Sequence, residues 1–122
     1  MALAKRFEDL EVWKKGCRLS CEIFRLAEKG SLSRNFVLRD QICRSGLSVP
    51  SNVAEGFERN SRKAFASFLR IAKGSSGELR TQIYISARLG YMDRKKAAEL
   101  VAQAEEISRM LGGLLVSIQP AE

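Results

Sequence analysis

Side chains that could carry out catalysis or bind a metal are scarce in this chain, because its 122 residues include no histidine. Histidine is the usual general base near neutral pH, the commonest metal ligand and the partner of a nucleophilic serine or cysteine. The three cysteines, Cys17, Cys21 and Cys43, form no Cys-x-x-Cys pair and lack further ligands for a zinc site. We therefore expect no metal, no cofactor and no catalytic residue, and we predict that the protein is not an enzyme.

Glycine-rich phosphate-binding motifs are also missing: no Gly-x-x-x-x-Gly-Lys loop, Gly-x-Gly-x-x-Gly fingerprint or Gly-x-Ser-x-Gly elbow is present. The segment Gly74-Ser75-Ser76-Gly77 has the composition of a phosphate loop but lies inside a strong helical pattern. Small residues that let two helices approach closely are the better interpretation of this segment.

Positive charge is the chemical feature that remains. The chain has 21 lysines and arginines against 14 acidic residues, a net charge of +7. Residues 34–77 hold eight of the basic side chains and three of the acidic ones, so +5 of the charge lies there. Thirteen of the 21 cations are arginines, whose planar guanidinium can bind a phosphate through two parallel hydrogen bonds.

A helical wheel concentrates part of this charge on one face of one helix. At about 100° per residue, Lys63, Arg70 and Arg88 fall within about 20° of one another, opposite the apolar stripe, with an aromatic residue, Tyr84, beside them. Such a surface can follow a phosphate backbone and stack a base, although a solvated face that only keeps the protein soluble has the same pattern. The candidate nucleic-acid-binding residues are Arg34, Arg44, Arg59, Arg62, Lys63, Arg70, Lys73 and Arg88.

The elements that must position these side chains are helices. Apolar residues recur every three or four positions along nearly the whole chain, and no stretch alternates with the period of a strand. The pattern predicts an all-α fold, an antiparallel up-down-up-down four-helix bundle, in one domain spanning residues 1–122. The expected helices cover residues 9–29, 35–55, 61–89 and 93–118.

Residues with a known preference for helix ends mark the predicted boundaries. Asp9, Ser61 and Asp93 are the expected N-caps of the first, third and fourth helices. Gly56 is expected to break the second helix, and Gly90 to end the third in the left-handed conformation that glycine adopts easily.

Three polar residues lie at or beside core positions. Asn52 and Glu55 are three residues apart in the second helix, and Glu78 borders the apolar stripe of the third. Pro50 has no N–H to donate, so it is expected to kink the second helix and to free a carbonyl. The structural interpretation is a hydrogen-bond network that fixes the helix register, with Arg44 as its charge partner; a ligand or RNA contact is the alternative.

Several segments give the chain a family resemblance over about residues 7–118. They are Phe7-Glu8-Asp9-Leu10-Glu11-Val12-Trp13, Val49-Pro50-Ser51-Asn52-Val53-Ala54-Glu55-Gly56, Phe68-Leu69-Arg70-Ile71-Ala72-Lys73-Gly74-Ser75, Glu78-Leu79 and Leu89-Gly90-Tyr91. In these segments the chain resembles the four-helix-bundle family named after the intervening sequences of bacterial 23S ribosomal RNA genes. It departs from the family pattern at Gly77, where a larger residue is expected, and at Cys43 and Gly46.

The resemblance implies a four-helix bundle and an assembly of several copies, but no biochemical activity. Family members are similar to the accessory proteins of diversity-generating retroelements, which form pentameric rings and bind nucleic acid and a reverse transcriptase through basic surfaces. We therefore expect a non-catalytic nucleic-acid-binding accessory protein, with RNA favoured over DNA, that assembles into a basic homo-oligomeric ring. The alternative is a scaffold or adaptor whose main partner is another polypeptide.

The sequence also suggests a location for the protein. Charged residues interrupt the first nine positions before any apolar stretch forms, which is not the pattern of a signal peptide. No run approaches the roughly 18–20 apolar residues of a membrane span. We expect a cytoplasmic protein with no membrane partner.

Overall fold

The computed structural model describes residues 4–118, and all regular structure in that range is helical. This confirms the all-α prediction. A short 3-10 turn, Phe7–Asp9, precedes the first helix. The α-helices are α1 (Glu11–Ala27), α2 (Gly30–Arg34), α3 (Phe36–Glu58), α4 (Arg62–Arg88) and α5 (Arg94–Ile118).

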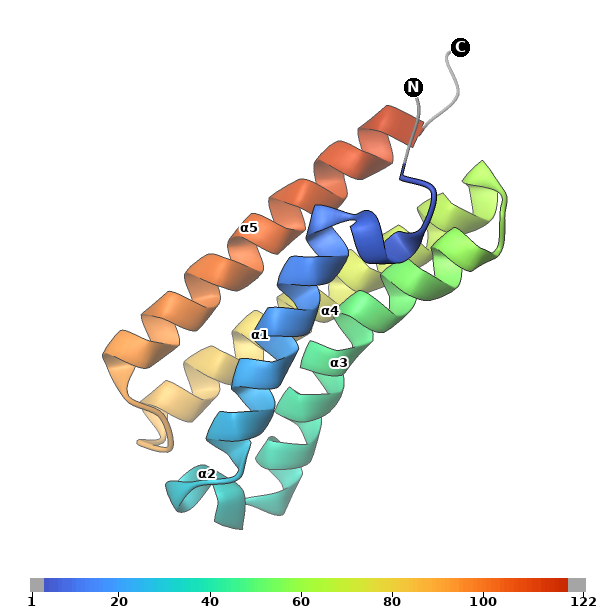
Figure 1. Ribbon diagram of the computed structural model, residues 1–122. Coiled ribbons are helices and arrows are strands. Elements are labelled where there is room, and N and C mark those ends of the chain that lie inside the picture. Colours follow the sequence, from blue (N-terminus) through green and yellow to red (C-terminus); the bar gives the residue numbers. More distant parts are fainter. Residues whose placement is uncertain (1–3, 119–122) are drawn as a thin grey trace.

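The four long helices pack around one apolar core (Figure 1). Helix α4 contacts α3 along one side and α5 along the other, and α1 contacts the same two helices. Helices α1 and α4 are therefore diagonal partners, and the short helix α2 connects α1 to α3. The up-down-up-down order and a kink at Pro50 stay predictions.

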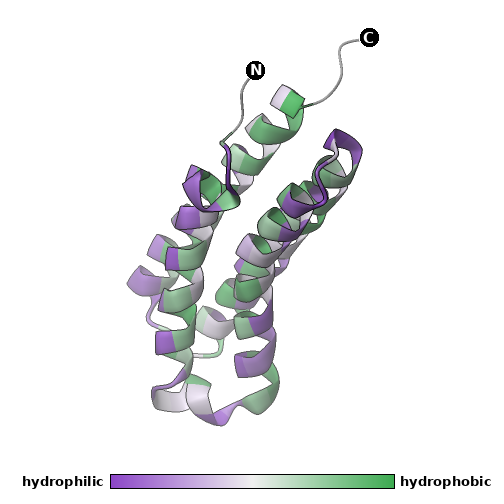
Figure 2. Cartoon of the chain, turned by 45° about the vertical axis from the view of Figure 1, so that its right-hand side comes forward, coloured by the Kyte–Doolittle hydropathy of each residue, from purple (hydrophilic) through white to green (hydrophobic). Residues whose placement is uncertain are grey.

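The core follows from the period of the apolar residues. Ile42, Leu69, Ile83, Leu100 and Leu111 are each fully shielded from solvent and come from three different helices. Each helix carries both hydrophobic and hydrophilic residues, so none is apolar on all of its faces (Figure 2). Within residues 4–118, no helix combines the length and the hydropathy that crossing a bilayer requires.

Gly56 does not break its helix, so this prediction was wrong. Helix α3 continues to Glu58, and Gly56 is buried where α3 meets α4. A Cβ atom at this position would lie 2.6 Å from Cβ of Phe68 and 3.2 Å from Cδ1 of Phe65. The glycine is therefore needed for the close approach of two helices, and its place in a strong apolar pattern outweighs its low helix propensity.

The other predicted boundary residues had mixed outcomes. The prediction of Asp9 as an N-cap was wrong, because Asp9 lies in the 3-10 turn and Leu10 caps α1. Ser61 and Asp93 are confirmed as caps, since their side chains accept hydrogen bonds from backbone N–H groups three residues ahead, at 3.0 and 3.1 Å. Gly90 has φ +78°, which confirms the left-handed end of α4.

Two features of the α1–α3 region differ from the simple predicted connection. The serine-rich segment after α1 forms the helix α2, which buries its own Leu32 to 2% exposure. Helix α3 runs through Pro50, whose ring packs on α1 at Gly16. A Cβ at Gly16 would lie 3.4 Å from the proline ring, so α1 and α3 also approach closely.

The close contact at Gly56 gives a stability prediction. Replacing Gly56 with alanine should lower the free energy of unfolding by about 1–3 kcal/mol, because the new methyl group collides with Phe68. The matched control is Gly74→Ala in α4, where nothing lies within 4 Å of the added Cβ. That change should raise stability by up to about 1 kcal/mol. Urea denaturation of both variants measures the difference; equal effects would contradict the packing account.

Candidate nucleic-acid interface

Helix α4 is held along two flanks, which leaves only one face toward solvent. On the α3 flank, the hydroxyls of Ser48 and Ser75 are hydrogen-bonded at 2.8 Å. On the α5 flank, the hydroxyl of Ser76 donates to the carbonyl oxygen of Ala104 at 3.0 Å. Ser76 also accepts a hydrogen bond from the hydroxyl of Ser108 at 2.9 Å.

The free face of α4 carries the cations that the helical wheel placed together. Lys63, Arg70 and Arg88 are all exposed. At about 1.5 Å per residue, Lys63 and Arg88 are separated by about 37 Å along the helix. Lys73 is also exposed but leans toward α5, since its Cε lies 3.7 Å from where a Cβ at Gly112 would stand.

The remaining predicted cations come from three other parts of the chain. Arg59 and Arg62 border the connection between α3 and α4, Arg44 lies on the outer side of α3, and Arg34 ends α2. Arg59 differs from the others because its Nε lies 2.9 Å from a carboxylate oxygen of Glu55. Its guanidinium also stands 5.2 Å from the ring centroid of Phe68, so part of its bonding capacity is used within the protein.

All eight predicted cations are exposed, and seven of them have no acidic partner within 4.0 Å among residues 4–118. Of the other cations in this range, some are paired, such as Lys15 with Glu106 and Lys96 with Glu22, and others, such as Arg18 and Arg25 of α1, have no acidic partner. The seven unpaired cations are Arg34, Arg44, Arg62, Lys63, Arg70, Lys73 and Arg88.

The structure does not gather these cations into one compact patch. On α4, Lys63, Arg70 and Lys73 lie in the first half of the helix and Arg88 at its end, and the stretch between them exposes Gly74, Glu78 and Thr81 and partly exposes Gly77. An added Cβ at either glycine would meet nothing within 4 Å. A large ligand can therefore approach the backbone of α4 closely between two basic regions.

The three predicted network residues lie in three different settings. Asn52 donates at 2.8 Å both to the carbonyl oxygen and to the hydroxyl of Ser48, which links it to α4 through Ser75. Glu55 binds Arg59 instead, on the surface of α3. Glu78 is exposed and has no ion-pair partner among the described residues. The structure thus joins Asn52, but neither glutamate, to a contact between helices.

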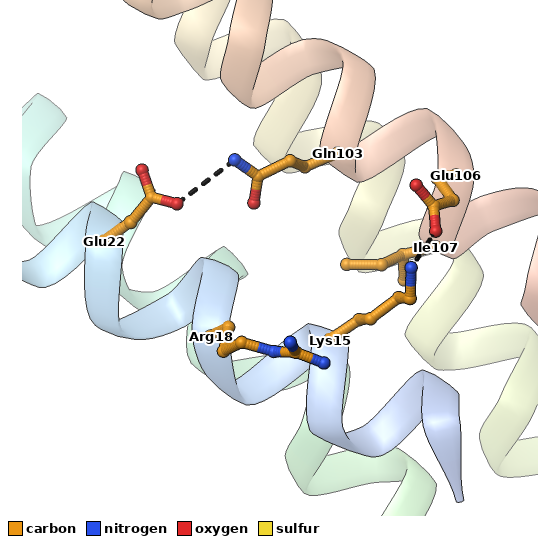
Figure 3. A pocket seen from close by; sticks show the side chains of 6 residues that line it. All are labelled: Lys15, Arg18, Glu22, Gln103, Glu106 and Ile107. Atoms are coloured by element: carbon orange, nitrogen blue, oxygen red, sulfur yellow. Dashed lines mark hydrogen bonds and ion pairs between the residues drawn. The ribbon is translucent and has the colours of Figure 1, made fainter.

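A concave site lies between α1 and α5, and most of its charged side chains pair with one another. Figure 3 shows Lys15 of α1 reaching Glu106 of α5, and Glu22 reaching Gln103. Glu22 also accepts a hydrogen bond from Lys96 at 2.8 Å. The hydrogen bonds from Lys96 and Gln103 lower the pKa of Glu22, and the bond to Glu22 raises the pKa of Lys96. The ion pairs of this pocket of about 240 Å³ therefore join two helices, and Arg18 is the lining cation that has no acidic partner among residues 4–118.

Sequence reasoning missed one cation of the basic surface. Arg94 opens α5 and lines a pocket together with Arg88 and Tyr84 at the end of α4. A wheel drawn for one helix cannot show a neighbour from the next one. The available signal was the run Arg94-Lys95-Lys96 directly after the predicted cap Asp93.

Comparison with known proteins places this architecture among related chains. The profile of the family described as 23S rRNA-intervening sequence protein matches residues 8–113. A crystal structure from Bacteroides thetaiotaomicron VPI-5482, described as a protein with unknown function from the S23 ribosomal protein family, superposes with a TM-score of 0.79. Its sequence is 25% identical, and the match covers 85% of this chain and 94% of that one. A comparison with curated proteins found no significant match.

The α1–α5 pocket gives a prediction on pH. Because the pKa of Glu22 is lowered in the folded chain, its ion pair contributes stability above the ordinary value of 4.5 and loses it as the pH falls through the lowered pKa. Glu22→Gln should therefore reduce stability at pH 7 by up to about 1 kcal/mol, and the deficit should shrink in acid. Urea denaturation between neutral and acidic pH measures this.

The control for that experiment is Glu78→Gln, which removes an exposed carboxylate that has no ion pair among the described residues. Its stability should follow that of the unchanged chain at every pH. A deficit of Glu22→Gln that stays constant into acid would contradict the assigned ion pair.

Proposed function

The chain belongs to the 23S rRNA-intervening sequence protein family, and from this premise we propose that it is a non-catalytic accessory protein that binds nucleic acid, with RNA favoured. The binding surface is the outer face of α4 with the adjoining cations of α2 and α3. The observation that carries the proposal is the set of seven exposed cations without acidic partners.

The cations on the outer face of α4 are informative because they share one helix face and contribute to no ion pair between helices among the described residues. Ion pairs at Lys15 and Lys96 tie α1 to α5, whereas Arg70 and Arg88 contribute to no such contact among residues 4–118. Positive charges on the same helix face repel one another, so these side chains add little to the stability of the fold. A phosphate backbone relieves that repulsion and releases counterions, which is the main source of affinity in nucleic-acid binding.

We also propose that the chain forms a homo-oligomeric ring, with five copies favoured. The support is the exposure of large apolar side chains on α1 and α3. Phe24 is 40% exposed, Leu47 51% and Phe36 64%. Assembly would remove such surface from water and multiply the net charge of +7 that each copy contributes.

A protein-interaction scaffold is the second candidate function. The same apolar side chains favour it, because they would serve equally well to bind another polypeptide, such as a reverse transcriptase. In that case the basic face would be secondary, and a partner would be retained after nuclease treatment.

The free face of α4 predicts a loss of binding. The double variant Arg70→Ala with Lys73→Ala should weaken binding to single-stranded RNA about 10- to 30-fold near 0.1 M salt. It should also reduce the slope of log affinity against log salt by about 1 to 2, because two phosphate contacts are removed. Fluorescence anisotropy over a salt series measures both quantities.

The matched control removes two cations from the opposite side of the bundle. Arg18 and Arg25 lie exposed on α1, which is diagonal to α4, and neither has an acidic partner within 4.0 Å among the described residues. The variant Arg18→Ala with Arg25→Ala changes the net charge equally and should leave affinity within about twofold. Equal losses in the two variants would show that net charge alone, and not the face of α4, holds the nucleic acid.

The ring gives a prediction on mass. One copy has a mass of 13.6 kDa, so five copies give 5 × 13.6 = 68 kDa. Sedimentation equilibrium should yield a species near that value without nucleic acid. A mass near 13.6 kDa at every protein concentration would reject the ring and leave the binding surface untouched.

A further inference from the structure

The end of the bundle where α4 passes into α5 contains a pocket with an aromatic ring and two arginines. Its volume is about 270 Å³, and it is lined by Tyr84, Ala87, Arg88, Arg94, Ala97 and Ala98. From this lining we propose that the pocket binds one unpaired nucleotide, with its base on the ring of Tyr84 and its phosphate between Arg88 and Arg94. The proposal rests on the proposed function, whose substrate class it narrows to single-stranded segments.

The side chain of Tyr84 is available for stacking. It is 51% exposed. The packing of the core therefore does not require an aromatic residue at this position. The facing wall is made of alanines, which leave room for a flat ring. A pocket of this size lies just below the roughly 300–1,000 Å³ of ordinary ligand sites, so it suits a single base.

The two arginines supply charge that the protein itself does not use. Neither Arg88 nor Arg94 lies within 4.0 Å of an acidic oxygen among residues 4–118. A guanidinium can donate two parallel hydrogen bonds to one phosphate, and two guanidinium groups at the rim of one pocket can bind it from both sides. Base and phosphate are thus recognised by adjacent groups, as in a nucleotide.

The start of α5 strengthens the positive potential at this pocket. Its first three residues are Arg94, Lys95 and Lys96, with no acidic residue in the first turn. Cations there oppose the helix dipole, whose positive end is the N-terminus, so this run does not stabilise the helix. Glu22 neutralises Lys96, while Arg94 and Lys95 have no such partner among the described residues.

A further cation stands at the same end of the molecule. The side-chain amide of Asn35 donates to the hydroxyl of Tyr91 at 3.3 Å, which joins the start of α3 to the α4–α5 connection. Figure 1 shows α2 and that connection at the same end of the bundle. Arg34, directly before Asn35, is therefore an exposed cation at the same end of the bundle as the pocket.

The occupant must be an unpaired nucleotide because a duplex hides the faces of its bases. Stacking on an aromatic side chain requires a base that is free on at least one face, as in a loop, a bulge or a strand end. The same base and phosphate are also offered by a free mononucleotide. The test therefore compares a single-stranded RNA, the matching duplex and adenosine monophosphate.

The experiment measures the affinity of the full chain for a labelled single-stranded RNA of about 12 nucleotides, which spans a typical site for single strands. Tyr84→Ala should weaken this binding about tenfold and leave duplex binding unchanged. Tyr84→Phe should retain it, because the ring remains. Ile85→Ala is the matched control, since Ile85 is also exposed, at 41%, but does not line the pocket.

A second pair of variants tests the phosphate contact. Arg94→Ala should weaken single-strand binding several-fold more than Lys95→Ala, although both remove one charge from the first turn of α5. Urea midpoints of all variants should match the unchanged chain, because these side chains are exposed. If adenosine monophosphate competes with the RNA, the occupant is a free mononucleotide. If RNA binding depends on Tyr84 and adenosine monophosphate does not compete, the occupant is a nucleotide within a strand.

The outcomes separate the pocket from the proposed function. If the unchanged chain binds RNA and Tyr84→Ala binds it equally well, the pocket is overturned while the basic surface stands. If no RNA is retained but adenosine monophosphate binds in a Tyr84-dependent way, the proposed function fails and the nucleotide pocket is supported. If neither probe binds, both are overturned.

Discussion

The packing of α4 between α3 and α5 constrains everything that this chain can present to a partner. Gly56 lets α3 come so close that an added Cβ there would lie 2.6 Å from Cβ of Phe68, and serine hydroxyls join α4 to both neighbours. Both flanks of the longest helix are thereby taken up by the fold. Only one strip of α4 reaches solvent, so the residue types on that strip are free to serve binding.

The charges of the chain divide according to this constraint. Between α1 and α5, lysines and glutamates form ion pairs that join the two helices: Lys15 pairs with Glu106, and Lys96 with Glu22. On the free strip of α4 the cations are exposed and have no acidic partner within the described part of the chain. Charge therefore joins α1 to α5, whereas, in the same part of the chain, the cations on the free strip of α4 join no two helices.

Sequence reasoning recovered the features that depend on one helix at a time. The apolar period predicted an all-helical chain, and the wheel predicted that Lys63, Arg70 and Arg88 share an exposed face. It failed where two elements meet. Gly56 looked like a break because its neighbours Phe65 and Phe68 belong to the next helix. The same limit applies to the site, because the pocket of Arg88 and Arg94 exists only when α5 folds back on α4.

The central claim is that nucleic acid lies on the outer face of α4, and photocrosslinking tests it most directly. Single-stranded RNA would be crosslinked to the unchanged chain by ultraviolet light, and the modified peptides identified by mass spectrometry. The predicted result is crosslinks on the outer face of α4 and at the start of α5, with Tyr84 among the modified residues and α1 unmodified. Crosslinks confined to α1 or to its pocket with α5 would contradict the account.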